Sequence, residues 1–330
     1  KRIRCTSNVG MRALILKNNL EPGQISAFHF GYVLGPCINA SGRLDTAKLA
    51  LKLFLEQDAP TASAIAAELT KLNSMRKDMT AEGVLSARAV VEAGNAGEKV
   101  YVIFLPMVHE SLAGIIAGRI REAYNRPTFV LTRSEDGVKG SGRSVEGYSM
   151  YDELCKCSEF FTKFGGHPMA AGLSMREESV DAFREKINIC CELTEADFIP
   201  KIKIDIPMPA GYPDVALVQE LTRLEPYGKG NPKPLFADRD LGIRQASIVG
   251  KNKNVLKLVL TTSRSERVSA VYFGDVAAWI NYYKEKYGSD ELDRAFAGQN
   301  NRIRLSVVYD PQINRYQGAE TIQLVIRNYR

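Results

Sequence analysis

A long amphipathic stretch is the feature that most restricts how this 330-residue chain can fold. It begins at Asp58-Ala59-Pro60, a typical helix start, and repeats apolar residues every three to five positions as far as Val91, with Gly94 as a stop. A helix of about thirty residues is roughly 45 Å long, which suits a spacer between two lobes. The pattern therefore predicts a long connecting helix within residues 59–97.

The residues before this helix predict a small helical region, 1–58. Apolar periodicity indicates helices over 11–20 and 46–55. Between them, residues 35–44 (GPCINASGRL) are so rich in Gly, Pro and small polar residues that we expect a loop. The start has no initiator Met and leads into no signal-type apolar core, so we expect the chain to be a piece of something longer.

Strand and helix patterns alternate over residues 98–192, which predicts a sheet covered by helices. We expect the glycine-rich residues 165–167 to form a turn. The expected strands are 100–105, 128–132, 140–144 and 170–175, and the expected helices are 113–124, 151–161 and 180–192.

After a proline-rich joint, residues 200–330 are dominated by strands. Apolar and polar residues alternate over 256–260, 303–309 and 322–326, the pattern of half-buried strands, and 316–319 links the last two as a hairpin. With one expected helix at 277–287, this pattern fits a small Greek-key barrel of the OB type. The predicted fold class is thus α/β plus all-β.

Composition and charge set wide limits on function. The net charge of +6 permits a nucleic-acid partner without requiring one. No apolar run approaches the roughly 20 residues needed to cross a bilayer, so no membrane association is expected. The six cysteines form no CxxC pair, and we interpret them as reduced thiols rather than a metal site, the pair Cys155 and Cys157 included.

Gly140-Ser141-Gly142-Arg143-Ser144 is a candidate phosphate-binding segment. Glycines let backbone N–H groups face a ligand closely, while the serine hydroxyl and the arginine fork add donors for phosphate oxygens. The same residues also fit an ordinary corner at the end of a strand, and the sequence favours neither reading.

Gly165-Gly166-His167 is a second candidate. Glycines beside a histidine allow close approach of another element, and such a histidine can donate to a phosphate or transfer a proton near neutral pH. The alternative is a turn histidine whose ring is satisfied by the backbone.

Two further segments remain open. His109-Glu110-Ser111 lies between an expected strand and an expected helix, where anions often bind, although Glu110 or Ser111 can also cap the helix. We favour the capping role for Glu110, and the role of His109 stays open. Asn39 and Arg43, in the expected loop, either hold a phosphate or fix a turn.

The sequence offers no set of metal ligands. Metal-dependent phosphodiesterases need several Asp and His ligands around the ion. No DHH triplet, HxxxH, HExxH or DxD cluster occurs, and three scattered histidines cannot build a two-metal centre. We therefore expect no bound metal, and no efficient hydrolysis by this chain alone.

Six motifs, taken in order, closely resemble the RecJ family of single-stranded-DNA exonucleases in the DHH phosphoesterase superfamily. The likeness covers essentially the whole chain. The motifs are GPCINASGRL, HESLAGIIAGR, GSGRS, FGGHPMAAG, EPYGKGNPKPLF and INRYQGAETIQL.

The resemblance implies three parts: the end of a DHH domain (1–58), a DHH-associated domain of type 1 (98–192) after the connecting helix, and a RecJ OB domain (200–330). It implies an exodeoxyribonuclease that cleaves single-stranded DNA from 5′ to 3′ in recombination and repair. Mn²⁺ or Mg²⁺ would be held by residues upstream of this chain. It also implies a cytoplasmic monomer whose partners include a single-stranded-DNA-binding protein and a RecQ-type helicase.

The resemblance further assigns roles to residues. Arg43, Ser141 and Arg143 resemble the positions that grip the 5′-terminal phosphate, and His167, with Gly165 and Gly166, resembles the histidine facing the scissile phosphate. This chain departs from the family in two places. It has Cys37 where the family usually has Arg, and residues 108–111 (VHES) where the family often has Trp-His-x-Gly.

The OB part offers cations and aromatic rings for single-stranded DNA. Lys251, Lys253 and Lys257 would supply positive charge along one hairpin. The candidates for base stacking are Tyr272, Phe273, Tyr309 and Tyr316, the alternative being aromatic residues of a barrel core.

Two rival functions remain at this stage. One is a phosphodiesterase of the same superfamily acting on short oligonucleotides or cyclic dinucleotides, which should lack the region after residue 200. The other is a non-catalytic DNA-binding scaffold descended from such an enzyme.

Overall fold

The computed structural model describes residues 2–95, 97–250, 252–316 and 318–330. The chain divides into two compact units, Lys1–Pro200 and Lys201–Arg330, each with its own hydrophobic cores. The six cysteines are all free thiols. Within the described ranges, no helix is both long enough and apolar enough to span a membrane.

The first residues of unit 1 form a helical cluster around the beginning of the long helix α5 (Ala59–Val90). The side chains of Leu14, Leu34, Leu53 and Leu69 are fully buried in its core. The other elements of the cluster are α1 (Val9–Lys17), α2 (Ala27–His29), α3 (Gly35–Leu44), α4 (Lys48–Leu55) and short turns at Arg2–Cys5, Pro22–Gln24 and Phe30–Leu34.

The expectation of a loop at 35–44 is wrong, because these residues form α3. The chain enters α3 directly from the π-helical turn Phe30–Leu34, and Pro36, the second residue of α3, lacks the N–H that would continue the hydrogen-bond ladder. Cys37, Ala40 and Ser41 are buried on one side of α3, which packs against α5. Burial of this small-residue face therefore outweighs the poor helix propensity of Gly, Ser and Asn.

The predicted long helix is confirmed as α5, with 32 residues. The Asp58 carboxylate caps it by accepting from the backbone N–H of Thr61 at 2.9 Å. Its first half packs in the helical cluster, and its second half packs on α6 (Ala113–Tyr124). Gly83 permits that second contact, since a Cβ there would lie 2.4 Å from Cδ1 of Ile116.

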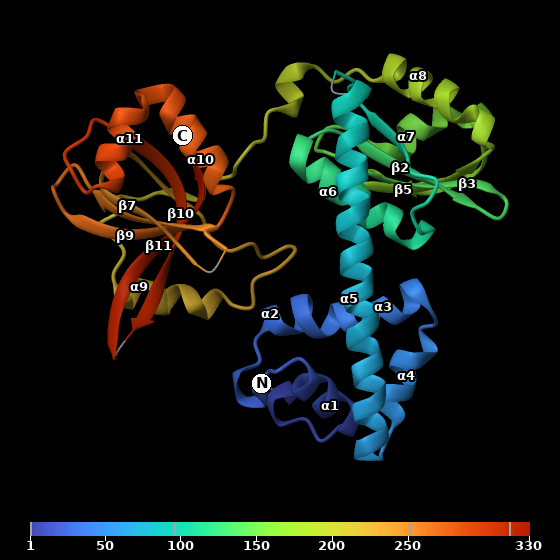
Figure 1. The fold of residues 1–330 in the computed structure, drawn as a ribbon, viewed down its shortest axis with the longest axis horizontal. Coiled ribbons are helices and arrows are strands. Elements are labelled where there is room, and N and C mark those ends of the chain that lie inside the picture. The colour runs from blue at the N-terminus through green and yellow to red at the C-terminus, as the bar shows by residue number, and fades with distance from the viewer. Residues whose placement is uncertain (1, 96, 251, 317) are drawn as a thin grey trace. The chain divides into compact units, whose positions relative to one another are not determined.

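The rest of unit 1 is a five-stranded sheet of order β1-β2-β3-β5-β4, covered by helices on both faces (Figure 1). Tyr101, Ile103 and Val130 pack with α6 on one face, while Val102 and Phe129 belong to the core of the other. The elements are β1 (Tyr101–Phe104), β2 (Thr128–Ser134), β3 (Gly137–Arg143), α7 (Met150–Cys155), β4 (Phe161–His167), β5 (Ala170–Met175), α8 (Val180–Cys190) and short turns at Val91–Asn95, Glu110–Leu112, Ser158–Phe160, Glu177–Ser179 and Glu195–Phe198.

Two expectations in this region are wrong. The helix expected over 151–161 ends at Cys155 as α7, and the chain enters β4 at Phe161. Residues 165–167 are not a turn but the end of β4, paired with β5. The turn is Pro168-Met169, and strand pairing holds Gly165 and Gly166 in an extended conformation that their intrinsic preferences do not favour.

Unit 2 is the expected OB-type barrel. Its strands are hydrogen-bonded in the order β7-β8-β9-β11-β10, and β10 pairs again with β7, so the sheet closes on itself. The β9·β11 pair is parallel and the other barrel pairs are antiparallel. The strands are β6 (Ile206–Pro207), β7 (Phe236–Val249), β8 (Val255–Thr261), β9 (Arg267–Tyr272), β10 (Arg304–Tyr316) and β11 (Ala319–Tyr329).

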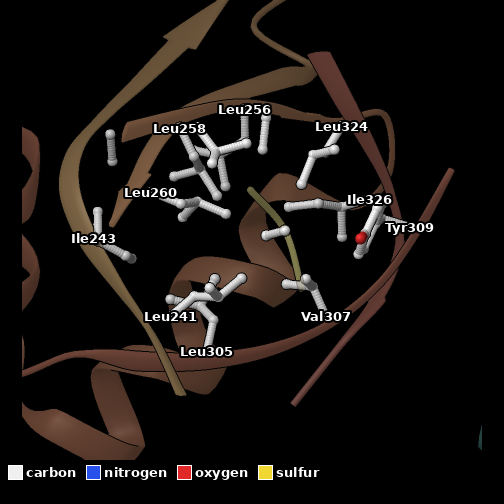
Figure 2. Packing of buried hydrophobic residues seen from close by; sticks show 14 of the residues in the cluster. Leu241, Ile243, Leu256, Leu258, Leu260, Leu305, Val307, Tyr309, Leu324 and Ile326 are labelled. Carbon is white, nitrogen blue, oxygen red and sulfur yellow. The ribbon is translucent and has the colours of Figure 1, made fainter. Parts of the chain in front are cut away.

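Alternate residues of the barrel strands point inward and fill its centre. Figure 2 shows Leu256, Leu258 and Leu260 of β8 converging with Leu305 and Leu324 from β10 and β11. The expected helix at 277–287 is confirmed as α10. The described part of unit 2 also contains two α-helices that were not predicted from the sequence, so its α-helices are α9 (Val215–Leu221), α10 (Val276–Tyr287) and α11 (Ser289–Phe296), with a short turn at Thr222–Leu224.

Candidate phosphate-binding site

The register of β3, β5 and β4 places the two glycine-rich motifs side by side. Arg143 pairs with Ala170, which pairs with His167 on the neighbouring strand. Further along the same strands, at a distance of two residues, Ser141 pairs with Gly172, and Gly172 pairs with Gly165. Directly opposed residues, and residues two apart on one strand, share a face of a sheet. Ser141, Arg143 and His167 therefore lie on the same face.

The two glycines of the first motif make room for side chains that pack on the opposite face of the sheet. A Cβ on Gly140 would lie 2.3 Å from Leu131 Cδ2, and one on Gly142 would lie 2.6 Å from Phe129 Cε1. Because β3 is hydrogen-bonded to strands on both sides, its N–H groups serve the sheet rather than a ligand. Gly142 was expected to face a phosphate, and the structure instead gives it a packing role.

Ser144 is also placed differently from the expectation. Its side chain is almost completely buried, and its hydroxyl donates to the backbone carbonyls of Tyr148 and Val145. The hydroxyl therefore holds the chain after β3 and does not face a cleft.

Two arginines converge on the start of α6. Arg43 Nη1 donates to the carbonyl oxygen of Ser111 at 2.9 Å, and Arg143 Nη1 donates to its neighbouring carbonyl of Gly142 at 2.7 Å. The Arg143 guanidinium lies against the first turn of α6, because a Cβ on Gly114 would be 2.6 Å from its Nη2. Only a glycine at 114 leaves that space free.

This pair of arginines forms an electropositive site. Burial lowers the pKa of Arg143, and the neighbouring Arg43 and Arg121 lower it further. The ion pairs recorded for the described residues include neither Arg43 nor Arg143. With the N-terminus of the 12-residue helix α6 beside them, the two guanidinium groups form a suitable site for a phosphate.

A cleft of about 440 Å³ adjoins these residues, between the sheet and the start of α6. Ser141, Gly165 and Gly172 form its floor, and Lys163 adds positive charge, whereas the charge of Lys139 is paired with Glu110. Neither lysine is among the site residues predicted from the sequence. The signal for Lys139 is its position two residues before Ser141, on the same face of β3.

The three residues at 109–111 mainly form a cap. Nδ1 of His109 lies 2.7 Å from the Ser111 hydroxyl and accepts the Ser111 N–H at 3.3 Å. Glu110, interpreted above as a possible cap, instead forms an ion pair of 2.9 Å with Lys139 across the cleft. His109 therefore takes the capping role itself.

His167 is exposed at the end of the edge strand β4. Its Nδ1 accepts the backbone N–H of Met169 at 3.3 Å. In the neutral ring this bond places the proton on Nε2, which makes Nε2–H a donor for an anion. Gly165, where a Cβ would have no neighbour within 4 Å, leaves open space on the same face.

Asn39 and Arg43 lie one turn apart on α3 and line a second, larger groove along α5. Cys37 does not face it, because its buried thiol contacts Asn18 and Asn73. Burial raises the pKa of this thiol above its ordinary value.

In the barrel, Lys253 lies in the β7–β8 loop and Lys257 is exposed on β8, whereas Lys251 lies outside the described residues. The Tyr309 ring is fully buried in the core, and its hydroxyl donates to the carbonyl of Met208, so it cannot stack on a base. Phe273, which is 63% exposed, remains a candidate. The Tyr272 ring packs edge-on against Tyr329, and the side chain of Tyr316 is outside the described set.

The residues present do not fit a metal centre. Within the described ranges, no three His, Cys, Asp or Glu side chains come together in a way that could hold a metal ion.

Two family models match the chain: the DHHA1 domain over residues 97–193 and the RecJ OB domain over residues 204–328. The chain is 28% identical to the single-stranded-DNA-specific exonuclease RecJ of Bacillus subtilis, over 99% of the chain and 40% of the relative. It is also similar to crystal structures of Thermus thermophilus RecJ with Mg²⁺ and with Mn²⁺, both at a TM-score of 0.77 and with 26% and 25% identity. Those matches cover 100% of this chain but 47% and 45% of the solved chains, so the chain spans about half the length of these relatives or less.

Proposed function

Because the chain belongs to the RecJ family, with a DHHA1 domain followed by a RecJ OB domain, we propose that it forms the phosphate-binding part of an exonuclease that degrades single-stranded DNA from 5′ to 3′. In this proposal residues 1–58 are the end of a DHH domain. The hydrolysis of the phosphodiester belongs to a larger protein whose metal ligands are not in this chain. The relatives solved with Mg²⁺ and Mn²⁺ support that metal dependence.

The convergence of Arg43 and Arg143 at the start of α6 is the observation that carries the proposal. Two guanidinium groups without carboxylate partners, next to a helix N-terminus, attract a dianionic terminal phosphate more strongly than a monoanionic internal one. Ser141, on the floor of the adjoining cleft, adds a hydroxyl donor. We assign this group of residues to the 5′-terminal phosphate.

His167 holds the next phosphate along the strand. Adjacent strands lie about 4.8 Å apart, so the two-strand separation between Arg143 and His167 is roughly 10 Å at the backbone. That separation leaves room for one nucleotide between the two groups. The His167 Nε2–H donates to the scissile phosphate, and Gly165 leaves space for the sugar.

The barrel binds the strand that follows. Lys253 and Lys257 contribute charge to the backbone and Phe273 contributes a ring for a base. The RecJ OB match is the observation that disfavours a phosphodiesterase of short or cyclic oligonucleotides, for which no such region is expected.

The test is to measure binding of a 5′-phosphorylated and a 5′-hydroxyl oligothymidylate by fluorescence anisotropy at low salt. We expect the chain to prefer the phosphorylated strand about tenfold, in line with one charge-assisted hydrogen bond of roughly 1.5 kcal/mol. Arg143→Ala should abolish that preference. His167→Asn should weaken the binding of both strands equally, because both contain internal phosphates.

Arg133→Ala is the matched control, since Arg133 lies on the neighbouring strand β2 and pairs with Glu177. It should keep the wild-type preference. Equal binding of the two strands by the wild-type chain, or an unchanged preference in Arg143→Ala, would contradict the proposal.

A further inference from the structure

A second groove of unit 1 lies between α3, α5 and α6 and has a volume of about 1030 Å³, more than twice that of the phosphate cleft. We call it the α5 groove. Nothing in the proposed function uses it, apart from Arg43 at its edge.

The α5 groove is strongly cationic. Its lining includes Arg43, Arg76, Lys77, Arg88 and Arg119, against one carboxylate, Glu122. Glu122 is engaged by Arg119 and Arg121 in exposed contacts of 3.4 Å. The ion pairs recorded for the described residues leave the other four cations without a carboxylate, so the groove retains a net positive charge that favours an anionic occupant.

Arg76 is fixed in place at the centre of this charge. Its Nε and Nη2 both donate to Oδ1 of Asn73, at 3.2 and 3.1 Å. Burial lowers the pKa of Arg76, and the nearby charges of Arg43 and Arg119 lower it further. Three guanidinium groups thus face a common space. A bound phosphate would offset the electrostatic repulsion between them.

The remaining lining suits a nucleoside. Val84 and Leu85 on α5 and Ile115 on α6 form an apolar stretch between Arg76 and Arg88, which are about 18 Å apart along the helix. The Tyr32 ring lies at the edge of the groove, is 72% exposed, and stacks on Phe28 with centroids 5.0 Å apart. Cations beside an apolar surface and an exposed ring are the features that bind a phosphate and a base together.

The α5 groove and the phosphate cleft meet at Arg43. Arg43 lines the groove, and its guanidinium contacts the carbonyl of Ser111, a residue of the cleft. Along α6 the cleft touches Ala113 in the first turn, whereas the groove continues over Ile115 and Arg119. The groove therefore leads away from the terminal-phosphate site on the side opposite the sheet.

We propose that the α5 groove binds the nucleoside 5′-monophosphate released by the reaction and provides its way out. This role rests on the proposed function, since a nucleotide freed between Arg143 and His167 has its phosphate already at Arg43. Leaving phosphate-first through the groove, it would not displace the strand that remains in the cleft.

The test uses the chain itself and calorimetric titration with thymidine 5′-monophosphate, thymidine and inorganic phosphate at low salt. We expect the monophosphate to bind at least tenfold more tightly than thymidine. Arg76→Ala and Arg88→Ala should each weaken it about five- to tenfold through loss of a charge-assisted contact. Tyr32→Ala should weaken the binding of the monophosphate but not the binding of inorganic phosphate.

Lys71→Ala is the matched control, because Lys71 is exposed on the same helix outside the groove. It should bind the monophosphate like the wild type, and unchanged thermal unfolding of each variant shows that the fold is intact. The inference is overturned if Arg76→Ala and Arg88→Ala bind like Lys71→Ala.

The two proposals fail separately. If only Arg143→Ala weakens the monophosphate, the nucleotide stays in the cleft, so the groove inference is lost and the proposed function stands. If the groove variants weaken the monophosphate while the oligonucleotides show no 5′-phosphate preference, the groove is a nucleotide site and the proposed function is wrong.

Discussion

At the scale of single residues, Gly114 controls where the Arg143 guanidinium lies. A Cβ at this position would come within 2.6 Å of Nη2, and the flexible arginine rather than the backbone would move. We therefore predict that Gly114→Ala preserves the fold but removes the preference for a 5′-phosphorylated strand. The anisotropy comparison of the two oligonucleotides measures this.

Gly118 is a matched control on the same helix, since a Cβ there meets nothing within 4 Å. Gly118→Ala should keep the 5′-phosphate preference and raise stability by roughly 0.5–1 kcal/mol, as Ala does in a helix interior. A retained preference in Gly114→Ala, or a loss in both variants, would show that Arg143 does not depend on this space.

The residue types at the candidate site were predicted from sequence, but not all of their roles. Ser141, Arg143, Gly165 and His167 do lie on one face, whereas Gly142 packs against the Phe129 ring. A glycine that exposes its backbone and a glycine that makes room for a neighbour look the same in sequence. These two kinds of glycine can be distinguished only when the residue that packs opposite the glycine is known.

At the scale of elements, two of the misassigned segments share one cause. Residues 35–44 form a helix despite two glycines and a proline, and residues 161–167 form a strand despite two adjacent glycines. In the first, packing against α5 overrides local preference, and in the second, pairing with the adjacent strand β5 does so. The strand β7 was not identified because polar residues such as Asp238 and Asp240 interrupt its alternation and a bulge follows at Ile243.

Helix α11 provides a pH-dependent prediction. The nearly buried Glu291 carboxylate accepts the backbone N–H of Arg302, and that bond, with the charges of Arg302 and Arg294, lowers its pKa below the ordinary value. A carboxyl group whose pKa is lower in the folded state stabilises the fold at pH values above its pKa in the unfolded chain, near 4.3. That contribution is lost as the pH falls through its pKa in the folded state.

We therefore expect the free energy of unfolding of unit 2 to decrease as pH falls below about 4. Urea unfolding between pH 3 and pH 6 measures it. Glu291→Gln should be less stable at pH 6 and show a weaker decrease on acidification, and Glu285→Gln, an exposed change on α10, controls for the substitution. An identical pH dependence in wild type and Glu291→Gln would contradict the assignment.

At the scale of the whole molecule, the net charge of +6 and the cations of both units predict salt-dependent binding of single-stranded DNA. With about four phosphates neutralised, the slope of log K against log salt should be roughly −3, since each contact on a single strand contributes about −0.7. Binding titrations at several NaCl concentrations between roughly 50 and 200 mM measure this slope.

The double variant Lys253→Ala/Lys257→Ala should reduce the magnitude of that slope by about 1.4 while leaving the 5′-phosphate preference intact, because the two lysines lie in unit 2. A slope near zero in the wild type, or an unchanged slope in the double variant, would show that the barrel lysines do not contact the strand.

The sequence by itself determined the long connecting helix, the alternation of strands and helices in 98–192, the barrel in the last third and the ordered motifs. These follow from local periodicity and residue type, which fix element type wherever burial repeats regularly. Tertiary structure alone decided that α3 is a helix, that β4, β5 and β3 stand in one register, and that Arg43 meets Arg143 at the start of α6. Those relations join residues up to a hundred positions apart, so they depend on packing that no local pattern records.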